Sequence, residues 1–138
     1  MDLSLSFQEK VIFSLRGLYR SYGYTQYKMS KFEEYDLYAN NKDFLISDRV
    51  ITFTDTNGKL MALKPDVTLS IIKNIKDPSE GVQKLFYNEN VYRVSKSTRR
   101  FRELMQVGLE CLGRIDDYCI CEVLMLAARS LAAISGSW

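Results

Sequence analysis

The sequence holds 138 residues, of which 46% are hydrophobic and 26% are charged, values typical of one folded domain and unlike those of a disordered or fibrous chain. Nineteen lysines and arginines against seventeen acidic residues leave a formal net charge of +2, far short of the basic excess that accompanies a large nucleic-acid footprint. The chain contains no histidine, which excludes histidine-based triads and general bases and removes the commonest metal ligand.

The start of the chain and its cysteines give no sign of export or of metal binding. The first residues carry an acid early and lack the basic and apolar segments of a signal peptide, and no later apolar run approaches membrane-spanning length. We therefore expect a cytoplasmic protein with no membrane partner. Cys111, Cys119 and Cys121 form an odd set without CxxC spacing, so we expect neither a structural disulfide nor a metal site.

The first predicted element is an amphipathic helix over residues 6–22. Its apolar positions recur at intervals of three and four residues and include Phe7, Val11, Leu15 and Leu18. Ser6 and Glu9 have the spacing of a capping box at its start. Gly23 suits the left-handed position that ends a helix.

A strand and a hairpin are predicted next. Residues 24–29 alternate bulky β-forming side chains with polar ones, as a half-buried strand does, and the charged stretch 31–36 is interpreted as the exit from this strand. Residues 50–55 and 59–63 flank an Asn-Gly pair, which supplies the positive φ angles of a tight turn. These two segments therefore predict a β-hairpin.

The rest of the chain predicts a short helix, a long hairpin and a final helix. Residues 68–75 repeat apolar side chains with helical spacing. Residues 84–93 and 102–113 are typical of long strands and are joined by a polar, basic loop, so they predict an antiparallel pair. Residues 116–133 form a helix that is apolar on most of its surface, and we expect it to be buried.

The second long strand has two different faces. One face carries Met105, Val107, Leu109 and Cys111, which we assign to the core. The other carries Gln106, Gly108 and Glu110. Gly108 leaves a hole there into which a ligand could settle, with Gln106 and Glu110 bonding its polar atoms and Glu110 suited to a cationic amine. A solvated sheet face with a bulge glycine is the alternative.

A cluster of basic residues surrounds the connection between the two long strands. It consists of Arg93, Lys96, Arg99, Arg100 and Arg102. Guanidinium and ammonium groups so placed could hold phosphate through charge-assisted hydrogen bonds. A solvated basic turn, kept for solubility, is the alternative.

Asp66 and Thr68 stand where a predicted strand passes into a predicted helix. Either side chain could cap the helix, which is the simplest explanation of an acid and a hydroxyl at such a junction. They could also contact a ligand.

Three segments, in this order, resemble histidyl-tRNA synthetase and its paralogue, the regulatory subunit of the short-form ATP phosphoribosyltransferase. The first helix with the Tyr-Gly-Tyr that follows it and Glu33 resembles class II motif 1, which builds the family's dimer interface, although Ser30 stands where that motif normally has proline. Residues 63–68 resemble the segment in which an acid and a threonine contact the amino group of histidine, where synthetases usually have Glu-Gly-Thr. Residues 86–113 resemble motif 2.

The resemblance implies a histidine site and, less strongly, a phosphate site. The residues that it assigns to histidine are Asp66, Thr68, Arg93, Gln106 and Glu110. Arg100 and Arg102 fall in the basic part of the motif 2 loop, where the family contacts phosphate. Ser95 replaces the glutamate expected two residues after the motif arginine, which weighs against adenine recognition. Glu89 is given no contact, so we expect its carboxylate to matter little for binding.

The implied fold is α+β, an antiparallel sheet flanked by helices that forms part of a class II aminoacyl-tRNA synthetase catalytic domain. We expect residues 1–138 to form a single domain that contains motifs 1 and 2. Motif 3 and the histidine-specific arginine segment lie further along the family's chains and have no counterpart here. We therefore do not expect this polypeptide to be a complete synthetase.

The Asp-Val-Thr segment and Ser95 favour the regulatory subunit over the synthetase. That function implies no catalytic residues, cofactor or metal, and it makes the catalytic ATP phosphoribosyltransferase subunit a partner. Histidine would be the ligand and the feedback inhibitor, tRNA would not be bound, and the chain would form a homodimer or a larger hetero-oligomer. The alternatives are a histidyl-tRNA synthetase fragment that activates histidine with ATP, and a stand-alone amino-acid-binding or dimerisation module.

Overall fold

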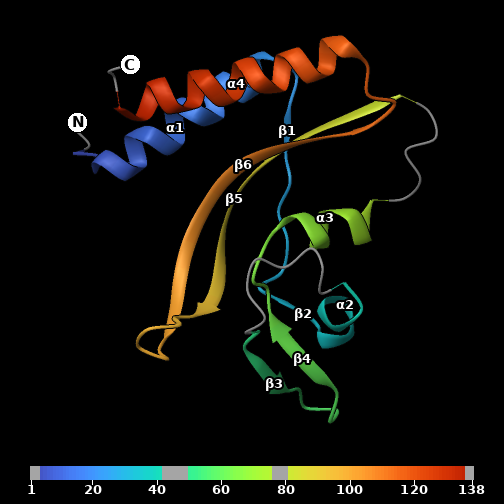
Figure 1. Cartoon of the computed structure of the whole chain (residues 1–138). Coiled ribbons are helices and arrows are strands. Elements are labelled where there is room, and N and C mark those ends of the chain that lie inside the picture. The colour runs from blue at the N-terminus through green and yellow to red at the C-terminus, as the bar shows by residue number, and fades with distance from the viewer. Residues whose placement is uncertain (1–3, 42–49, 76–80, 136–138) are drawn as a thin grey trace. The chain divides into compact units, whose positions relative to one another are not determined.

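A computed structural model of the chain describes residues 4–41, 50–75 and 81–135 (Figure 1). The elements in chain order are α1 (Phe7–Ser21), β1 (Thr25–Gln26), β2 (Phe32–Glu34), α2 (Tyr35–Ala39), β3 (Thr52–Thr54), β4 (Leu60–Leu63), α3 (Thr68–Asn74), β5 (Val82–Val94), β6 (Phe101–Gly113) and α4 (Asp117–Ser135). The strands form two three-stranded sheets, with orders β1-β5-β6 and β2-β4-β3.

The described residues group into two compact units. The first unit contains residues 4–27, 81–88 and 107–135, and the second contains residues 28–41, 50–75 and 89–106. The long strands β5 and β6 each contribute residues to both units. The organisation of residues 1–138 as a single domain stays a prediction.

In the first unit, local signals define both ends of α1. The Ser6 hydroxyl accepts a hydrogen bond of 3.2 Å from the Glu9 amide, and the Glu9 carboxylate accepts one of 2.7 Å from the Ser6 amide. This is the predicted capping box, and its bonds to the carboxylate lower the pKa of Glu9. Gly23 has a φ of +85°, the left-handed conformation expected at the end of the helix.

The core of the first unit lies between its two helices and the strands. The buried residues are Leu15, Tyr19, Tyr24, Phe86 and Leu126. Helices α1 and α4 run side by side (Figure 1), and the hydroxyl groups of Tyr19 and Ser130 are 2.7 Å apart. Val107 and Leu109 pack against this core from β6, as predicted for that face of the strand, whereas Met105, assigned to the same face, is 37% exposed.

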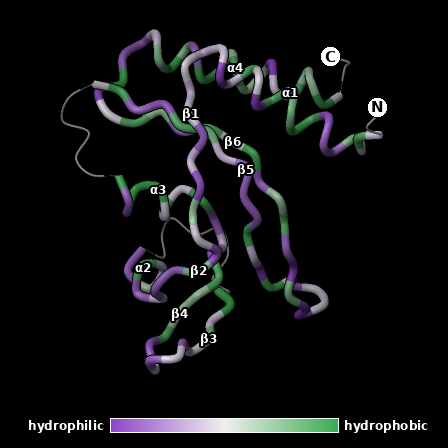
Figure 2. Tube along the Cα trace, turned by 180° about the vertical axis from the view of Figure 1, so that it is seen from behind, coloured by the Kyte–Doolittle hydropathy of each residue, from purple (hydrophilic) through white to green (hydrophobic). Residues whose placement is uncertain are grey.

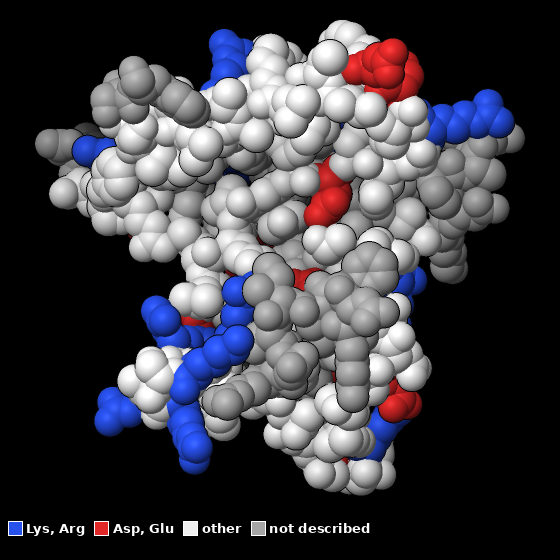
Figure 3. All heavy atoms as spheres, viewed as in Figure 1, with Lys and Arg blue, Asp and Glu red and all other residues white. Residues whose placement is uncertain are grey.

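The expectation that the last helix is buried is wrong. Glu122 and Leu126 are the buried residues of α4, whereas Leu124 is 65% exposed and Leu131 is 57% exposed. Hydrophobic stretches recur along α4 in Figure 2, and the region of α4 in Figure 3 is largely uncharged. Burial depends on how many faces of a helix find partners, and here α4 uses one face against α1 and the strands.

The described part of the chain contains one helix, α4, that is long and apolar enough to cross a membrane by length and composition. The expectation that no apolar run approaches membrane-spanning length is therefore wrong for this segment. A core helix of a protein folded in water meets the same criteria. Two of the three charged residues of α4 bond within the first unit, since Glu122 pairs with Lys84 and Arg129 donates to the Tyr22 hydroxyl.

In the second unit, β3 and β4 form the predicted hairpin. Gly58 has a φ of +80° in its turn. The Asp55 carboxylate accepts hydrogen bonds of 2.7 Å and 3.1 Å from the amides of Asn57 and Lys59. The turn therefore stabilises the register that pairs Thr54 with Leu60.

The charged stretch 31–36 is a strand and the start of a helix, which corrects its interpretation as an exit segment. In β2, Phe32 pairs with Leu63 of β4 in an antiparallel ladder. The acids that made the stretch look like a loop have partners, since Glu33 lies 3.1 Å from the Lys73 ammonium and Glu34 lies 2.6 Å from that of Lys59. Pairing with residues distant in the sequence here outweighs the low β-strand preference of the charged side chains.

The long strands β5 and β6 are neighbours in their sheet and are joined by the short turn 95–100, as predicted. The Ser95 amide donates a hydrogen bond of 2.8 Å to the Arg100 carbonyl across this turn. Helices and largely antiparallel strands together give the expected α+β fold.

Candidate functional site

The second unit brings three of the predicted histidine residues together. Asp66 precedes α3, Thr68 is its first residue, and Arg93 lies near the end of β5. The Arg93 Nε donates a hydrogen bond of 3.0 Å to the Pro65 carbonyl, and the Asp66 Oδ1 accepts one of 3.1 Å from the Leu69 amide. Val67 is the N-cap residue of α3 and makes no side-chain cap bond, so Asp66 accepts from a first-turn amide one position earlier than an N-cap residue would. The Asp66 carboxyl group also feels the charge of Arg93.

Asp66 has an environment that favours a cationic ligand. Burial raises the pKa of its carboxyl group, while the hydrogen bond from the Leu69 amide and the charge of Arg93 act in the opposite direction. A desolvated carboxylate of this kind gains most from a new positive neighbour, because the partial loss of water leaves it incompletely compensated. An ammonium group bound beside Asp66 would therefore be stabilised.

A buried ion pair beside this group was not foreseen from the sequence. The Lys64 side chain is fully buried, and its ammonium lies 2.9 Å from the Glu89 carboxylate, which also accepts a hydrogen bond of 3.2 Å from the Met29 amide. Glu89 therefore has a structural role, and the expectation that its carboxylate matters little for binding stays a prediction. A lysine directly after the apolar run of β4 was the available signal, because a buried charged group needs a partner.

On β6 the hole expected at Gly108 is filled by a side chain of the same unit. A Cβ atom at Gly108 would lie 2.5 Å from the Tyr87 hydroxyl oxygen and 2.7 Å from the ring carbon that carries it. The Tyr87 ring, on the neighbouring strand, thus covers Gly108. This cross-strand contact is possible because glycine has no Cβ atom. A ligand on this face would have to contact or displace Tyr87.

Gln106 and Glu110 are half-buried residues of the same strand. Gln106 belongs to the second unit and Glu110 to the first. The pocket that the resemblance implies, in which both meet Asp66 and Arg93, therefore stays a prediction. Glu110 also lines a cavity of about 290 Å³ between β6 and α4.

The two weaker phosphate candidates lie at the end of the long hairpin. Arg100 and Arg102 are exposed, and Lys and Arg side chains gather over this end of the hairpin in Figure 3. Arg99 has a φ of +54°, an uncommon backbone conformation for a residue other than glycine. The hydroxyl of Ser95 lies 3.2 Å from that of Ser97, so the position where the family has glutamate is part of the turn.

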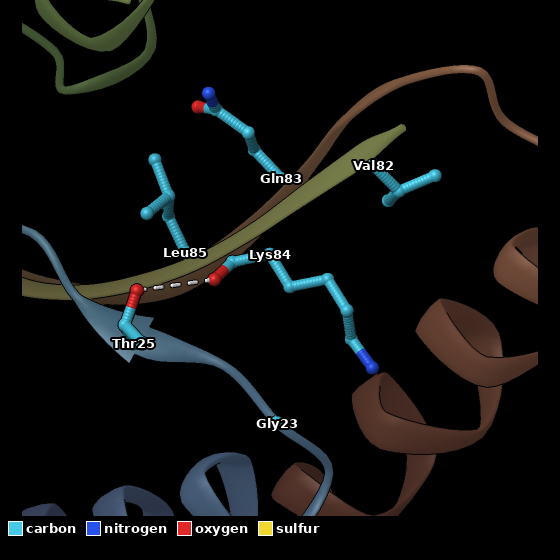
Figure 4. Close-up of a pocket in the computed structure, with 6 residues that line it drawn as sticks. All are labelled: Gly23, Thr25, Val82, Gln83, Lys84 and Leu85. Atoms are coloured by element: carbon cyan, nitrogen blue, oxygen red, sulfur yellow. Dashed lines mark hydrogen bonds between the residues drawn. The ribbon is translucent and has the colours of Figure 1, made fainter. Parts of the chain in front are cut away.

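A second cavity of about 290 Å³ lies in the first unit beside Lys84 (Figure 4). The Lys84 ammonium lies 2.7 Å from the Glu122 carboxylate, donates to the Tyr22 carbonyl and sits 4.7 Å from the centre of the Tyr24 ring. These contacts neutralise the lysine and use its donors, so it does not form an anion site. Among the described residues there is also no group of three or more potential metal ligands.

Comparison with known proteins identifies the family. Residues 5–137 match the family model described as histidyl-tRNA synthetase. This chain belongs to that family. The assignment of Asp66 and Arg93 to the family's motifs stays a prediction.

The family relatives have two different names. Over 124 residues the chain is 32% identical to the histidine–tRNA ligase of Methanosarcina acetivorans, a match that covers 87% of this chain and 30% of that protein. It is 28% identical over 123 residues to the ATP phosphoribosyltransferase regulatory subunit of Oceanobacillus iheyensis, covering 88% and 30%. The chain thus spans about a third of the length of these curated relatives.

Solved structures share the fold. A protein of Bacillus halodurans described as an ATP phosphoribosyltransferase regulatory subunit/histidyl-tRNA synthetase matches with a TM-score of 0.75 at 21% identity, covering 98% of this chain and 37% of that one. A chain of the ATP phosphoribosyl transferase (HisG:HisZ) complex of Thermotoga maritima matches with a TM-score of 0.68 at 25% identity, covering 96% and 43%. The fold is that of part of the class II synthetase catalytic domain.

Proposed function

We propose that this chain is part of a non-catalytic regulatory subunit of ATP phosphoribosyltransferase, acting in the first step of histidine biosynthesis. The observation that carries the choice between the two family functions is Ser95. A synthetase of this family would use a glutamate there to read adenine, whereas the Ser95 hydroxyl faces Ser97 and its amide closes the hairpin turn on Arg100. Relatives with the regulatory name support the proposal.

Under this proposal the chain binds the catalytic ATP phosphoribosyltransferase subunit, which the likeness to a chain of the HisG:HisZ complex of Thermotoga maritima supports. Histidine is the ligand and acts as a feedback signal. Asp66, Thr68, Arg93, Gln106 and Glu110 contact it, with the carboxylates facing its cationic groups and Arg93 its carboxylate. Such a protein works in the cytoplasm as a homodimer or within a larger hetero-oligomer.

The function is tested with the protein that the complete gene encodes. Added to the catalytic subunit, it should raise the rate of phosphoribosyl transfer, and histidine should lower that rate again. Alone it should show no histidine-dependent exchange of pyrophosphate into ATP. Such exchange would overturn the regulatory function in favour of the synthetase.

The site is tested by calorimetric titration with histidine. Glu110→Gln keeps the shape of the side chain and removes its charge, so we expect binding to weaken by roughly 1.5–3 kcal/mol, and Asp66→Asn should behave similarly. Glu103→Gln is the matched control, because this exposed acid of β6 bonds only neutral donors of Asn90 and Tyr92 in the contacts described. Unchanged affinity in Glu110→Gln would remove Glu110 from the site.

The second candidate is a fragment of a histidyl-tRNA synthetase, favoured by the 32% identity to the Methanosarcina acetivorans ligase. Its test is the same pyrophosphate exchange. A stand-alone amino-acid-binding or dimerisation module is the remaining alternative. It predicts no effect on phosphoribosyl transfer and no pyrophosphate exchange.

A further inference from the structure

Two of the three cysteines lie on neighbouring elements of the first unit. Cys111 is near the end of β6, and Cys119 is in the first turn of α4. Between them the chain reverses at Gly113, which has a φ of +114°. Asp116 then caps α4 by accepting a hydrogen bond of 2.9 Å from the Cys119 amide. This short reversal carries the start of α4 back toward the strand that it has just left.

The two thiol groups face a common space. Both cysteines are half-buried and line the cavity of about 290 Å³ between β6 and α4, together with apolar side chains that include Leu109 and Val123. The thiols also interact with each other. Burial is the largest cause that raises the pKa of Cys111, and the neighbouring Cys119 thiol is the next.

The surroundings argue against two other uses of these thiols. The described residues contain no group of three or more metal ligands, whereas structural zinc is almost always held by four. A catalytic nucleophile needs a lowered pKa so that the thiolate is present at neutral pH, and burial raises the pKa of Cys111 instead. Two adjacent protonated thiols can still be oxidised to a disulfide, in which their hydrogens are lost and the two sulfurs are bonded.

We propose that Cys111 and Cys119 form a reversible intrachain disulfide. With a peroxide as the oxidant, one thiolate attacks the O–O bond and becomes a sulfenic acid, and water or an alcohol leaves. The second thiol then attacks that sulfur and displaces water. The two thiols lose two electrons and two protons, which the peroxide accepts as its O–O bond breaks. The proposal does not depend on the function proposed above.

The third cysteine provides an internal control. Cys121 follows Cys119 by two residues on α4, a rotation of about 200° around the helix axis, and it is exposed. It does not line the cavity that Cys111 and Cys119 share. The disulfide should therefore select Cys119 over Cys121, although the two are nearly equally distant from Cys111 in the sequence.

The experiment maps disulfides in the 138-residue chain after oxidation with hydrogen peroxide and, in a second arm, with glutathione disulfide. Alkylation of the remaining thiols should label one of the three cysteines, and dithiothreitol should restore all of them. Trypsin cleaves after Arg114, so the disulfide will hold together the two peptides that contain Cys111 and Cys119. Because the thiolate is the attacking species, oxidation should speed up as the pH rises into the alkaline range.

Variants decide which sulfur is used. Cys121→Ser should form the crosslink as the parent does, and Cys119→Ser should lose it. A crosslink that survives in Cys119→Ser, disulfides only between chains, or three alkylated cysteines after oxidation in both arms would each overturn the proposal. The disulfide maps of the parent and of Cys121→Ser already show whether the crosslink forms. The test therefore does not need a third variant, Cys111→Ser, to fold.

Discussion

Asp66 is a half-buried carboxyl group whose effects on stability and on ligand binding oppose each other. Burial raises its pKa above the ordinary value of 3.8, so the folded state holds the proton more tightly than the unfolded state. The protonated form therefore adds to the free energy of unfolding at pH values below the ordinary pKa. This contribution is lost as the pH rises through the raised pKa of the folded state. At neutral pH the ionised carboxylate therefore lowers the free energy of unfolding. Under the proposed function, the benefit of this carboxylate is that it binds an amine.

The first prediction concerns Asp66→Asn, which removes the charge and keeps an oxygen that can accept from the Leu69 amide. We expect the free energy of unfolding to exceed that of the parent at neutral pH. The difference should shrink as the pH falls below about 4, where both side chains are neutral. Urea unfolding at a series of pH values measures this. A variant that is less stable than the parent at neutral pH would show that the attraction of Arg93 outweighs burial.

The second prediction concerns the ion pair of Lys64 and Glu89. Lys64 is fully buried and Glu89 is 16% exposed, so Glu89→Gln leaves a buried ammonium without its counter-charge. Breaking such a pair from one side costs about 3–5 kcal/mol, and we expect a loss of stability of that order in urea unfolding.

The matched control for this prediction is Glu34→Gln. Glu34 pairs with Lys59 at 2.6 Å, but the two side chains are 46% and 54% exposed. Water screens an exposed pair and its long side chains lose freedom when they pair, so this variant should be nearly as stable as the parent. If the two substitutions lowered the free energy of unfolding equally, the burial of Lys64 would not determine how much its ion pair contributes to stability.

At the scale of elements, α4 has two apolar faces. One is packed through Leu126 against the core of the first unit. The other is a stripe of exposed side chains at spacings of four, three, four and three residues, formed by Ile120, Leu124, Ala127, Leu131 and Ile134. This is the spacing with which helices pack against one another. The sequence therefore shows how much of α4 is apolar but not which part the first unit buries.

The third prediction separates these faces. Leu126 is fully buried and Leu124 is 65% exposed. Leu126→Ala should lower the free energy of unfolding by about 2–5 kcal/mol because it opens a cavity in the core, whereas Leu124→Ala should change it by about 0.5 kcal/mol or less. Thermal and urea unfolding of both variants measure the contrast. A large effect at Leu124 would mean that its face is covered in solution.

At the scale of the whole molecule, α1 combines a buried face with exposed aromatic residues. Leu15 and Tyr19 are each 3% exposed, whereas Phe7 is 69% and Phe13 is 51% exposed. The motif 1 resemblance assigns the segment 7–33 to a twofold interface, in which the same patch on two copies meets itself. Exposed aromatic side chains are typical anchors of such interfaces.

The fourth prediction is therefore that the chain forms dimers that depend on α1. In sedimentation equilibrium we expect a dimer at high concentration, and Phe13→Asp should weaken association at least about tenfold, or 1.4 kcal/mol. Leu60→Asp is the control, because Leu60 is 47% exposed on β4, outside segment 7–33. A monomeric parent at all concentrations would contradict the prediction, as would equal effects of the two substitutions.

The sequence by itself determined the features that depend on neighbours along the chain. The capping box of Ser6 and Glu9, the left-handed Gly23 and the turn at Gly58 follow from residues within a few positions of one another. The two faces of β6 follow from strict alternation, and the α+β class II fold followed from motifs in the correct order. Short-range backbone preferences are sufficient for the cap, the turns and the alternation, whereas the fold class followed from the resemblance of the motifs to a known family.

Only the tertiary structure decided which distant side chains meet. Lys64 and Glu89 are 25 positions apart, and the bond from the Met29 amide to Glu89 spans 60 positions. The Tyr87 ring over Gly108 and the facing thiols at the β6–α4 reversal are likewise products of packing. Periodicity assigns a residue to a face but does not say what lies opposite it. That depends on strand pairing and helix docking, whose energy is shared among many residues far apart in the chain.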